Sequence, residues 1–231
     1  MKHLNRRQWL GKAAACIAMP AGGLLSGLAY AGQLEEPLTH SMVTALSAAI
    51  GDRAAPKLEF DEISEHIAHL KWLGEMSKRL ESRIPNYDWR IELLETVRYE
   101  SRRAGIETAL VLGLIQTESA FKQYAVSSAG ALGYMQIMPF WTRLIGDGDV
   151  GKLFHMQTNL RYGCVILRHY MDIEKGDMFL ALGRYNGSRG QSKYPDTVYR
   201  FRENWLYEPP AVTDPATPEL TTPVLTATSA D

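Results

Sequence analysis

Residues 109–136 read ALVLGLIQTESAFKQYAVSSAGALGYMQ, and the rest of the chain is organised around this stretch. It opens with an almost unbroken apolar run over residues 109–115 that has no polar face, so we expect it to be buried on all sides. The run is too long for a typical strand, and Glu107-Thr108 offers an N-cap in front of it. These features predict a core helix.

A single carboxylate, Glu118, follows the apolar run and is itself followed by Ser119. The predicted helix therefore delivers Glu118 to the edge of an apolar core. A carboxyl group in that setting tends to keep its proton near neutral pH, because burial disfavours the charged form. This is the behaviour required of a general acid, and Glu118 is our candidate catalytic residue.

Small residues fill the loop that follows, over residues 127–133. Such residues allow backbone to approach a substrate closely. Tyr134-Met135-Gln136 comes directly after the loop, and we expect these residues to form one wall of a substrate cleft.

Three motifs in this order resemble the soluble lytic transglycosylase (SLT) family. They are Glu118-Ser119, the loop 125–133 with Tyr134-Met135-Gln136 and Pro139, and Tyr185-Asn186-Gly187. The resemblance covers residues 91–205, about half of the chain. It implies a mainly α, goose-lysozyme-like (SLT) helical domain that cleaves peptidoglycan without a cofactor.

Four segments are predicted. Residues 1–31 form an export signal, residues 32–85 an N-terminal helical extension, residues 86–207 the catalytic domain, and residues 208–231 a tail. The tail is rich in Pro, Thr and Ala with few large apolar residues, which predicts disorder.

The export signal has a basic start, an apolar middle, and Ala29-Tyr30-Ala31 as a cleavage site. Arg6-Arg7 and their neighbours resemble a twin-arginine motif, and the general secretory route remains open. Either route predicts a periplasmic protein. An uncleaved anchor is the alternative, and a lipid on Cys16 is disfavoured because Ala13-Ala14-Ala15 is a poor lipid box.

Composition excludes several classes of function. The net charge is −1 with neutral histidines, and no basic footprint of a nucleic-acid binder is present. After cleavage only Cys164 remains, so no internal disulfide is expected and the thiol should be an inert core group. We expect His66 and His69 to be surface residues without a metal, and Asp147 and Asp149 lack the spacing of an EF-hand loop.

Further helices are expected from apolar residues that recur at gaps of three and four. One spans residues 61–84 with Asp61 as its N-cap, and one spans 91–104 before Gly105. Four further helices are expected to start at Pro139, Thr158, Asp177 and Asp196, and residues 42–50 form a short one. In the helix from Thr158, the residues expected to face the core are Leu160, Cys164, Leu167 and Met171.

The resemblance also implies a mechanism. Glu118 protonates the oxygen that links N-acetylmuramic acid to N-acetylglucosamine, and the substrate's acetamido group stabilises the positive charge. Glu118 then takes the proton of the muramic C6 hydroxyl, which closes a 1,6-anhydro ring. Tyr185 matches the family tyrosine that hydrogen-bonds this glutamate. The substrate-binding candidates are Ser119, Met135, Gln136, Tyr185 and Asn186. Asn159 and Gly163 match a structural family motif, and Arg184 replaces the usual Ala.

Two other functions compete with this one. A lysozyme-type muramidase on the same fold would use water in place of the C6 hydroxyl, and the sequence discriminates poorly between the two because fold does not fix chemistry. Only one carboxylate stands in a plausible catalytic setting, which favours the transglycosylase. An inactive glycan-binding scaffold of an envelope machine is disfavoured, because Glu118, Gln136 and Tyr185-Asn186 occur together. Peptidoglycan strands are the expected partner of a monomer, with a trans-envelope secretion or conjugation apparatus as a further partner.

Overall fold

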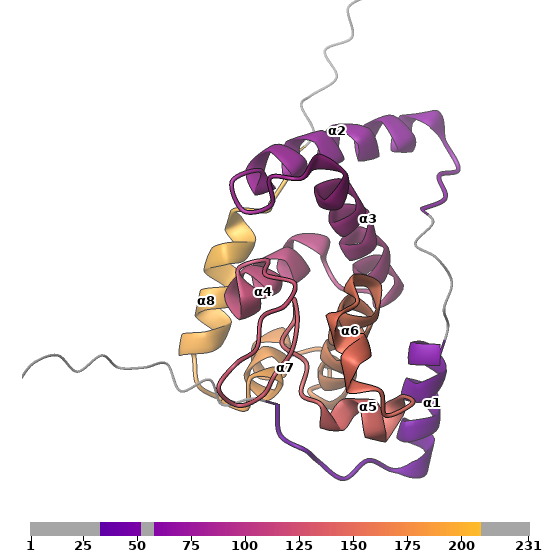
Figure 1. Ribbon diagram of the computed structural model, residues 1–231, viewed down its shortest axis with the longest axis vertical. Helices are drawn as coiled ribbons and strands as arrows, with labels where there is room; N and C mark the ends of the chain where they lie inside the picture. The colour runs from indigo at the N-terminus through magenta and orange to yellow at the C-terminus, as the bar shows by residue number, and fades with distance from the viewer. Residues whose placement is uncertain (1–32, 52–57, 209–231) are drawn as a thin grey trace, which may run out of the picture.

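The computed structural model of the chain describes residues 33–51 and 58–208 (Figure 1). The predicted export signal, and all of the predicted tail except Glu208, lie outside the described residues. Within the described ranges the chain forms eight α-helices and one 3-10 helix, and the only β-structure is a pair of isolated bridges around Leu132. The prediction of a mainly α fold is confirmed.

From α2 onward the helices follow one another with short connections, apart from the loop between α4 and α5. Their bounds are α1 His40–Gly51, α2 Ile63–Leu80, α3 Tyr87–Arg103, α4 Thr108–Ser119, α5 Phe140–Ile145, η1 Val150–Phe154, α6 Met156–Ile173, α7 Met178–Tyr185 and α8 Lys193–Glu203.

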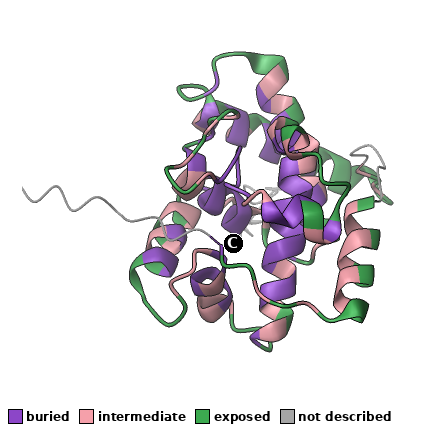
Figure 2. Ribbon diagram, turned by 60° about the horizontal axis from the view of Figure 1, so that its bottom comes forward, coloured by how far each residue is buried: buried purple, intermediate pink, exposed green. Residues whose placement is uncertain are grey.

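The apolar run forms α4, and α4 is the central helix of the core as predicted. Every residue from Ala109 to Ile115 is buried, which a helix without a polar face requires. Figure 2 shows the buried segments gathered in the middle of the molecule, with partly exposed helices around them. Glu107 stands at the N-cap position but makes no side-chain capping bond; it pairs instead with Arg202 on α8.

Helix α8 lies along α4, and the two contact closely because α4 has a glycine at the crossing (Figure 1). A Cβ atom on Gly113 would lie 2.6 Å from the backbone nitrogen of Arg202 and 2.9 Å from the carbonyl oxygen of Val198. Trp205 adds a hydrogen bond from its indole nitrogen to Gln116 at 2.9 Å. The crossing places the start of α8 beside the end of α4.

The expected bounds of α2 were wrong at both ends. The helix begins at Ile63, with Glu62 rather than Asp61 at the N-cap position, and ends at Leu80 rather than Ile84. The apolar stripe predicted for this helix packs only in the second half, because Ile63, Ile67 and Leu70 are exposed while Leu73, Met76 and Leu80 are buried. The first half extends past the helices it would pack on.

The remaining helices differ from expectation mainly in where they start. Helix α6 begins before Thr158, so Thr158 lies inside it, and α8 begins at Lys193 rather than Asp196. Asp177 caps α7 as predicted, accepting from the backbone N–H of Leu180 at 3.0 Å. Cys164 is buried on α6 as expected, and burial raises the pKa of its thiol.

Candidate active site

Glu118 lies in the last turn of α4, where the chain turns sharply out of the helix. Ala120 and Phe121 follow it with φ of 50° and 66°, a left-handed conformation that costs free energy for residues other than glycine. Phe121 is buried and its ring meets Trp205 edge-on at 5.2 Å, which anchors the turn. Nothing in the sequence indicated this backbone strain next to Glu118.

The carboxyl group of Glu118 has a pKa raised to about 8, and burial is the main cause. Its surface is only partly exposed. The opposing cause is a hydrogen bond from Tyr194, which favours the ionised form. At neutral pH Glu118 therefore holds a proton that it is able to donate.

Tyr194, in the first turn of α8, donates its hydroxyl hydrogen bond to Oε1 of Glu118. The α4–α8 crossing described above brings the two residues together although they are 76 positions apart in sequence. The sequence did not indicate Tyr194 as a hydrogen-bond partner of Glu118. Spacing along one helix reveals partners only within that helix, so this contact had no sequence signal.

Tyr185 does not make the hydrogen bond that the resemblance implied. Its hydroxyl donates to the carbonyl oxygen of Met135 at 2.8 Å, and Tyr194 takes the place next to Glu118. Burial raises the pKa of Tyr185, and the nearby charge of the Glu118 carboxylate raises it further. Tyr185 therefore still lies near Glu118. It positions the backbone at residue 135.

Ser119 and Met135 belong to the framework of the site. The hydroxyl of Ser119 donates to the carbonyl oxygens of Ile115 and Tyr134, at 3.2 and 2.7 Å, and is buried. Met135 is fully buried and packs against Gly163 of α6, where a Cβ atom would lie 2.2 Å from its sulfur. We expected Met135 to contribute to the wall of the cleft, and in this structure its side chain is buried in the core.

Gln136 adopts a left-handed backbone with φ of 49° and turns its amide back into the loop. Its Nε2 donates to the carbonyl oxygens of Gly133 and Ala125, at 2.9 and 3.2 Å. Asn186 is half-buried after α7, and its amide donates to Ser188 at 2.9 Å. In this structure both predicted binding residues make internal hydrogen bonds.

Asn159, which we expected to be structural, holds the loop against α6. Its Oδ1 accepts from the N–H of Met135 at 2.8 Å, and its Nδ2 donates to the carbonyl oxygens of Leu132 and Leu153. The side chain is fully buried, so these three bonds satisfy it. A Cβ atom on Gly133 would clash with it at 2.2 Å, and φ of 76° at Gly133 also favours glycine.

The groups that shift the pKa of Glu118 include no second carboxylate among the residues placed by the structure. Nor do those residues contain a cluster of three metal-ligating side chains. His69 is buried rather than on the surface as we expected. It stacks on Phe60 and Trp72, and burial lowers its pKa to about 4.

Comparisons with known proteins find one matching family model and several similar sequences. Residues 95–206 match the model of the Transglycosylase SLT domain. A membrane-bound lytic murein transglycosylase C from Glaesserella parasuis is 41% identical over 92 residues, which are 39% of this chain and 24% of that protein. A transglycosylase from Enterobacteria phage PRD1 is 32% identical over 100 residues, 43% of this chain and 36% of that protein.

A solved structure is also similar, that of an inactive mutant of the lytic transglycosylase Slt from Pseudomonas aeruginosa. It shares 17% identity and a TM-score of 0.39, over 75% of this chain and 36% of that one. This chain spans about a quarter of the length of the Glaesserella relative. No helix among the described residues has the length and apolar character needed to cross a membrane.

Proposed function

Because residues 95–206 match the model of the Transglycosylase SLT domain, we propose that the chain is a peptidoglycan lytic transglycosylase. It cleaves the β-1,4 bond between N-acetylmuramic acid and N-acetylglucosamine and leaves a 1,6-anhydromuramic end. The observation that carries this proposal is the single carboxyl group of Glu118, which is partly buried, has a pKa raised to about 8, and accepts a hydrogen bond from Tyr194.

Glu118 acts first as an acid in this reaction. Its proton goes to the glycosidic oxygen, the bond from that oxygen to C1 breaks, and the acetamido oxygen of the same sugar stabilises the positive charge at C1. The Tyr194 hydroxyl stabilises the carboxylate that is left, since a donor to the ionised form lowers the pKa of a carboxyl group.

Glu118 then acts as a base. It takes the proton of the C6 hydroxyl, whose oxygen attacks C1 and closes the anhydro ring. A group that first donates and then accepts a proton needs a pKa close to the working pH, and the Glu118 pKa of about 8 meets this requirement. The sequence offers no second carboxylate in a plausible catalytic setting, which favours this reaction over hydrolysis by a muramidase.

The reaction is tested by replacing the acid. Purified peptidoglycan is incubated with wild type, with Glu118→Gln, and with Glu65→Gln as a control at an exposed position on α2. We expect Glu118→Gln to keep its circular dichroism spectrum and to release no soluble muropeptides, while Glu65→Gln behaves as wild type. Release by Glu118→Gln within tenfold of wild type would contradict the proposed role of Glu118.

The proposal also includes the location of the protein and its partners. We place the protein in the periplasm, as a monomer acting on glycan strands. The predicted export signal in residues 1–31 supports this, and the family domain supports the substrate. Opening the wall for a secretion or conjugation apparatus is consistent with such an activity. Deletion of the gene should then lower transfer or secretion while bulk wall turnover continues.

A further inference from the structure

Residues 33–39 precede α1 without regular structure, and we call them the N-terminal arm. Figure 1 shows the arm leaving the region below α7 and running along the lower edge of the molecule to α1. None of its residues takes part in the proposed reaction. Its first residue, Gln33, is nevertheless buried beside the candidate active site.

The side-chain amide of Gln33 binds two backbone groups that flank Ile137. Its Oε1 accepts from the N–H of Met138 at 3.2 Å, and its Nε2 donates to the carbonyl oxygen of Gln136 at 3.4 Å. It also hydrogen-bonds the side chain of Tyr185, whose hydroxyl donates to Met135. Gln33 thus lies against the loop that carries the predicted substrate-binding residues.

These backbone groups are suited to an amide ligand. A backbone N–H needs an acceptor and a carbonyl oxygen needs a donor, and a side-chain amide provides both. The acetamido group of an amino sugar carries the same chemistry, an amide oxygen that accepts and an amide nitrogen that donates. It would therefore compete with Gln33 for the Met138 N–H or for the Gln136 carbonyl oxygen.

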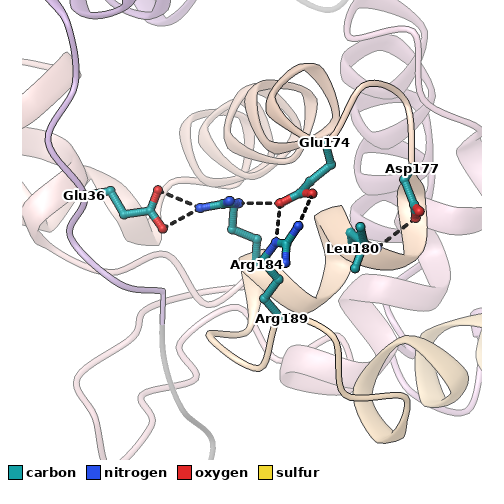
Figure 3. A network of polar contacts seen from close by, with 6 residues as sticks. All are labelled: Glu36, Glu174, Asp177, Leu180, Arg184 and Arg189. Carbon is teal, nitrogen blue, oxygen red and sulfur yellow. Dashed lines mark hydrogen bonds and ion pairs between the residues drawn. The ribbon is translucent and has the colours of Figure 1, made fainter.

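A set of ion pairs holds the arm in place three residues further on (Figure 3). Glu36 accepts from Nη1 of Arg184 at 2.7 and 2.8 Å, and Nε of Arg184 donates to Glu174 at 2.8 Å. Arg189 also pairs with Glu174, at 2.7 and 2.8 Å. Arg184 and Arg189 stand on either side of Tyr185-Asn186-Gly187, so the arm is tied to the motif that borders the site.

The arm is attached weakly for a segment so close to the site. The Glu36 side chain is 38% exposed and that of Arg184 is 21% exposed, and ion pairs in contact with water contribute little to stability. Leu34 is exposed, and the apolar residues that attach the arm and α1 to the core, Leu38, Leu46 and Ile50, are only partly buried. Segments with few buried apolar contacts open at low cost in free energy.

We propose that the N-terminal arm is an intramolecular competitor of the glycan, with Gln33 occupying backbone groups that an acetamido group of the substrate would take. The Glu36–Arg184 pair keeps the arm docked, and productive binding requires the arm to leave. This inference rests on the proposed function, because that function identifies the displaced ligand as an amino sugar.

The test compares the full chain with Gln33→Ala, Glu36→Gln and Arg184→Ala. Glu35→Gln is the matched control, because Glu35 is the neighbouring glutamate and, among the residues that the structure describes, forms an ion pair with exposed Arg143 alone, at 3.9 Å. Affinity for tri-N-acetylchitotriose is measured by calorimetry, and release of muropeptides from peptidoglycan is measured in parallel. We expect at least threefold tighter binding and faster release for the three arm variants, and wild-type values for Glu35→Gln.

Hydrogen exchange of the arm itself separates competition from a general effect on the fold. Saturating trisaccharide should speed exchange at residues 34–39 in wild type by at least threefold, while exchange in α4 stays unchanged. Trisaccharide binding that leaves exchange in the arm unchanged would overturn the proposal, and so would weaker binding by Gln33→Ala and Glu36→Gln, which would make the arm part of the binding surface.

Failure of the arm proposal and failure of the proposed function give different results. No trisaccharide binding by any variant would overturn the competition, yet muropeptide release by wild type would still support the transglycosylase. Tighter trisaccharide binding by the arm variants without any muropeptide release would support the competition and refute the reaction.

Discussion

At the scale of single residues, the raised pKa of Glu118 provides a proton for the reaction and lowers the stability of the fold near neutral pH. Its carboxyl group has a pKa of about 8 in the folded protein, against 4.5 for an ordinary glutamate. Above pH 4.5 the unfolded chain releases this proton while the folded chain keeps it, so folding becomes less favourable as the pH rises towards 8. Below pH 4.5 both states hold the proton and the penalty vanishes.

Glu118→Gln should therefore be more stable than wild type at pH 7 to 8. Each pKa unit corresponds to about 1.4 kcal/mol, so we expect a gain of at least about 1 kcal/mol, or about 2–4 °C in Tm. The gain should shrink on acidification and disappear near pH 4. Thermal unfolding of both proteins across this range measures it, and a difference independent of pH would show that the pKa of Glu118 is not raised.

Tyr194→Phe tests the hydrogen bond to Glu118 without removing the acid. That bond lowers the pKa of Glu118, so its loss should raise the pKa further. The alkaline limb of kcat/KM should then move to higher pH, because Glu118 keeps its proton longer. The rate itself should fall by about 10- to 100-fold, since the acid is no longer held in place. Tyr185→Phe is the comparison, because Tyr185 bonds Met135, and it should leave the limb where it is.

At the scale of elements, the α4–α8 crossing builds the site by placing Tyr194 beside Glu118. Gly113→Ala would push a methyl group against backbone atoms of Arg202 and Val198 on α8. Backbone atoms cannot move aside as the end of a flexible side chain can. Overpacking of this kind costs about 1–3 kcal/mol. We expect a lower Tm and a loss of activity larger than the loss of folded protein explains, because the Tyr194–Glu118 distance changes.

Gly74→Ala is the matched control for this prediction. Gly74 is also inside a helix, α2, but a Cβ atom there meets nothing within 4 Å. Alanine is favoured over glycine in a helix by about 1 kcal/mol, so this variant should gain stability and keep its activity. Equal behaviour of the two variants in thermal unfolding would contradict the proposed role of the crossing.

The sequence predicted most elements because their cause is local. The apolar run of α4, the Asp177 cap and the glycine after α3 each act within a few residues, and each was found. The start of α8 and the exposed half of α2 were missed, because both depend on which helix lies opposite. Apolar periodicity predicts which face of a helix is buried, but it does not predict how far the neighbouring helix extends along that face.

At the scale of the whole molecule, the proposed site depends on contacts between distant parts of the chain. Glu118 was identifiable from its position after a buried run. Tyr194, Gln33 and the Glu36–Arg184 pair were not, because they approach the site from α8 and from the N-terminal arm. Ser119 and Met135 matched family positions, yet their side chains are used internally. The motifs therefore indicate where the proposed site lies, and the arrangement of its residues depends on the fold.

The central claim is that Glu118 serves as acid and then as base, so that the C6 hydroxyl and not water attacks C1. The measurement that tests it most directly is mass spectrometry of the soluble products released from purified peptidoglycan by the wild-type chain. We predict 1,6-anhydro-muropeptides, one water lighter than the products of hydrolysis, and none of them with Glu118→Gln. Muropeptides with reducing muramic ends as the main product would contradict the account and indicate a muramidase.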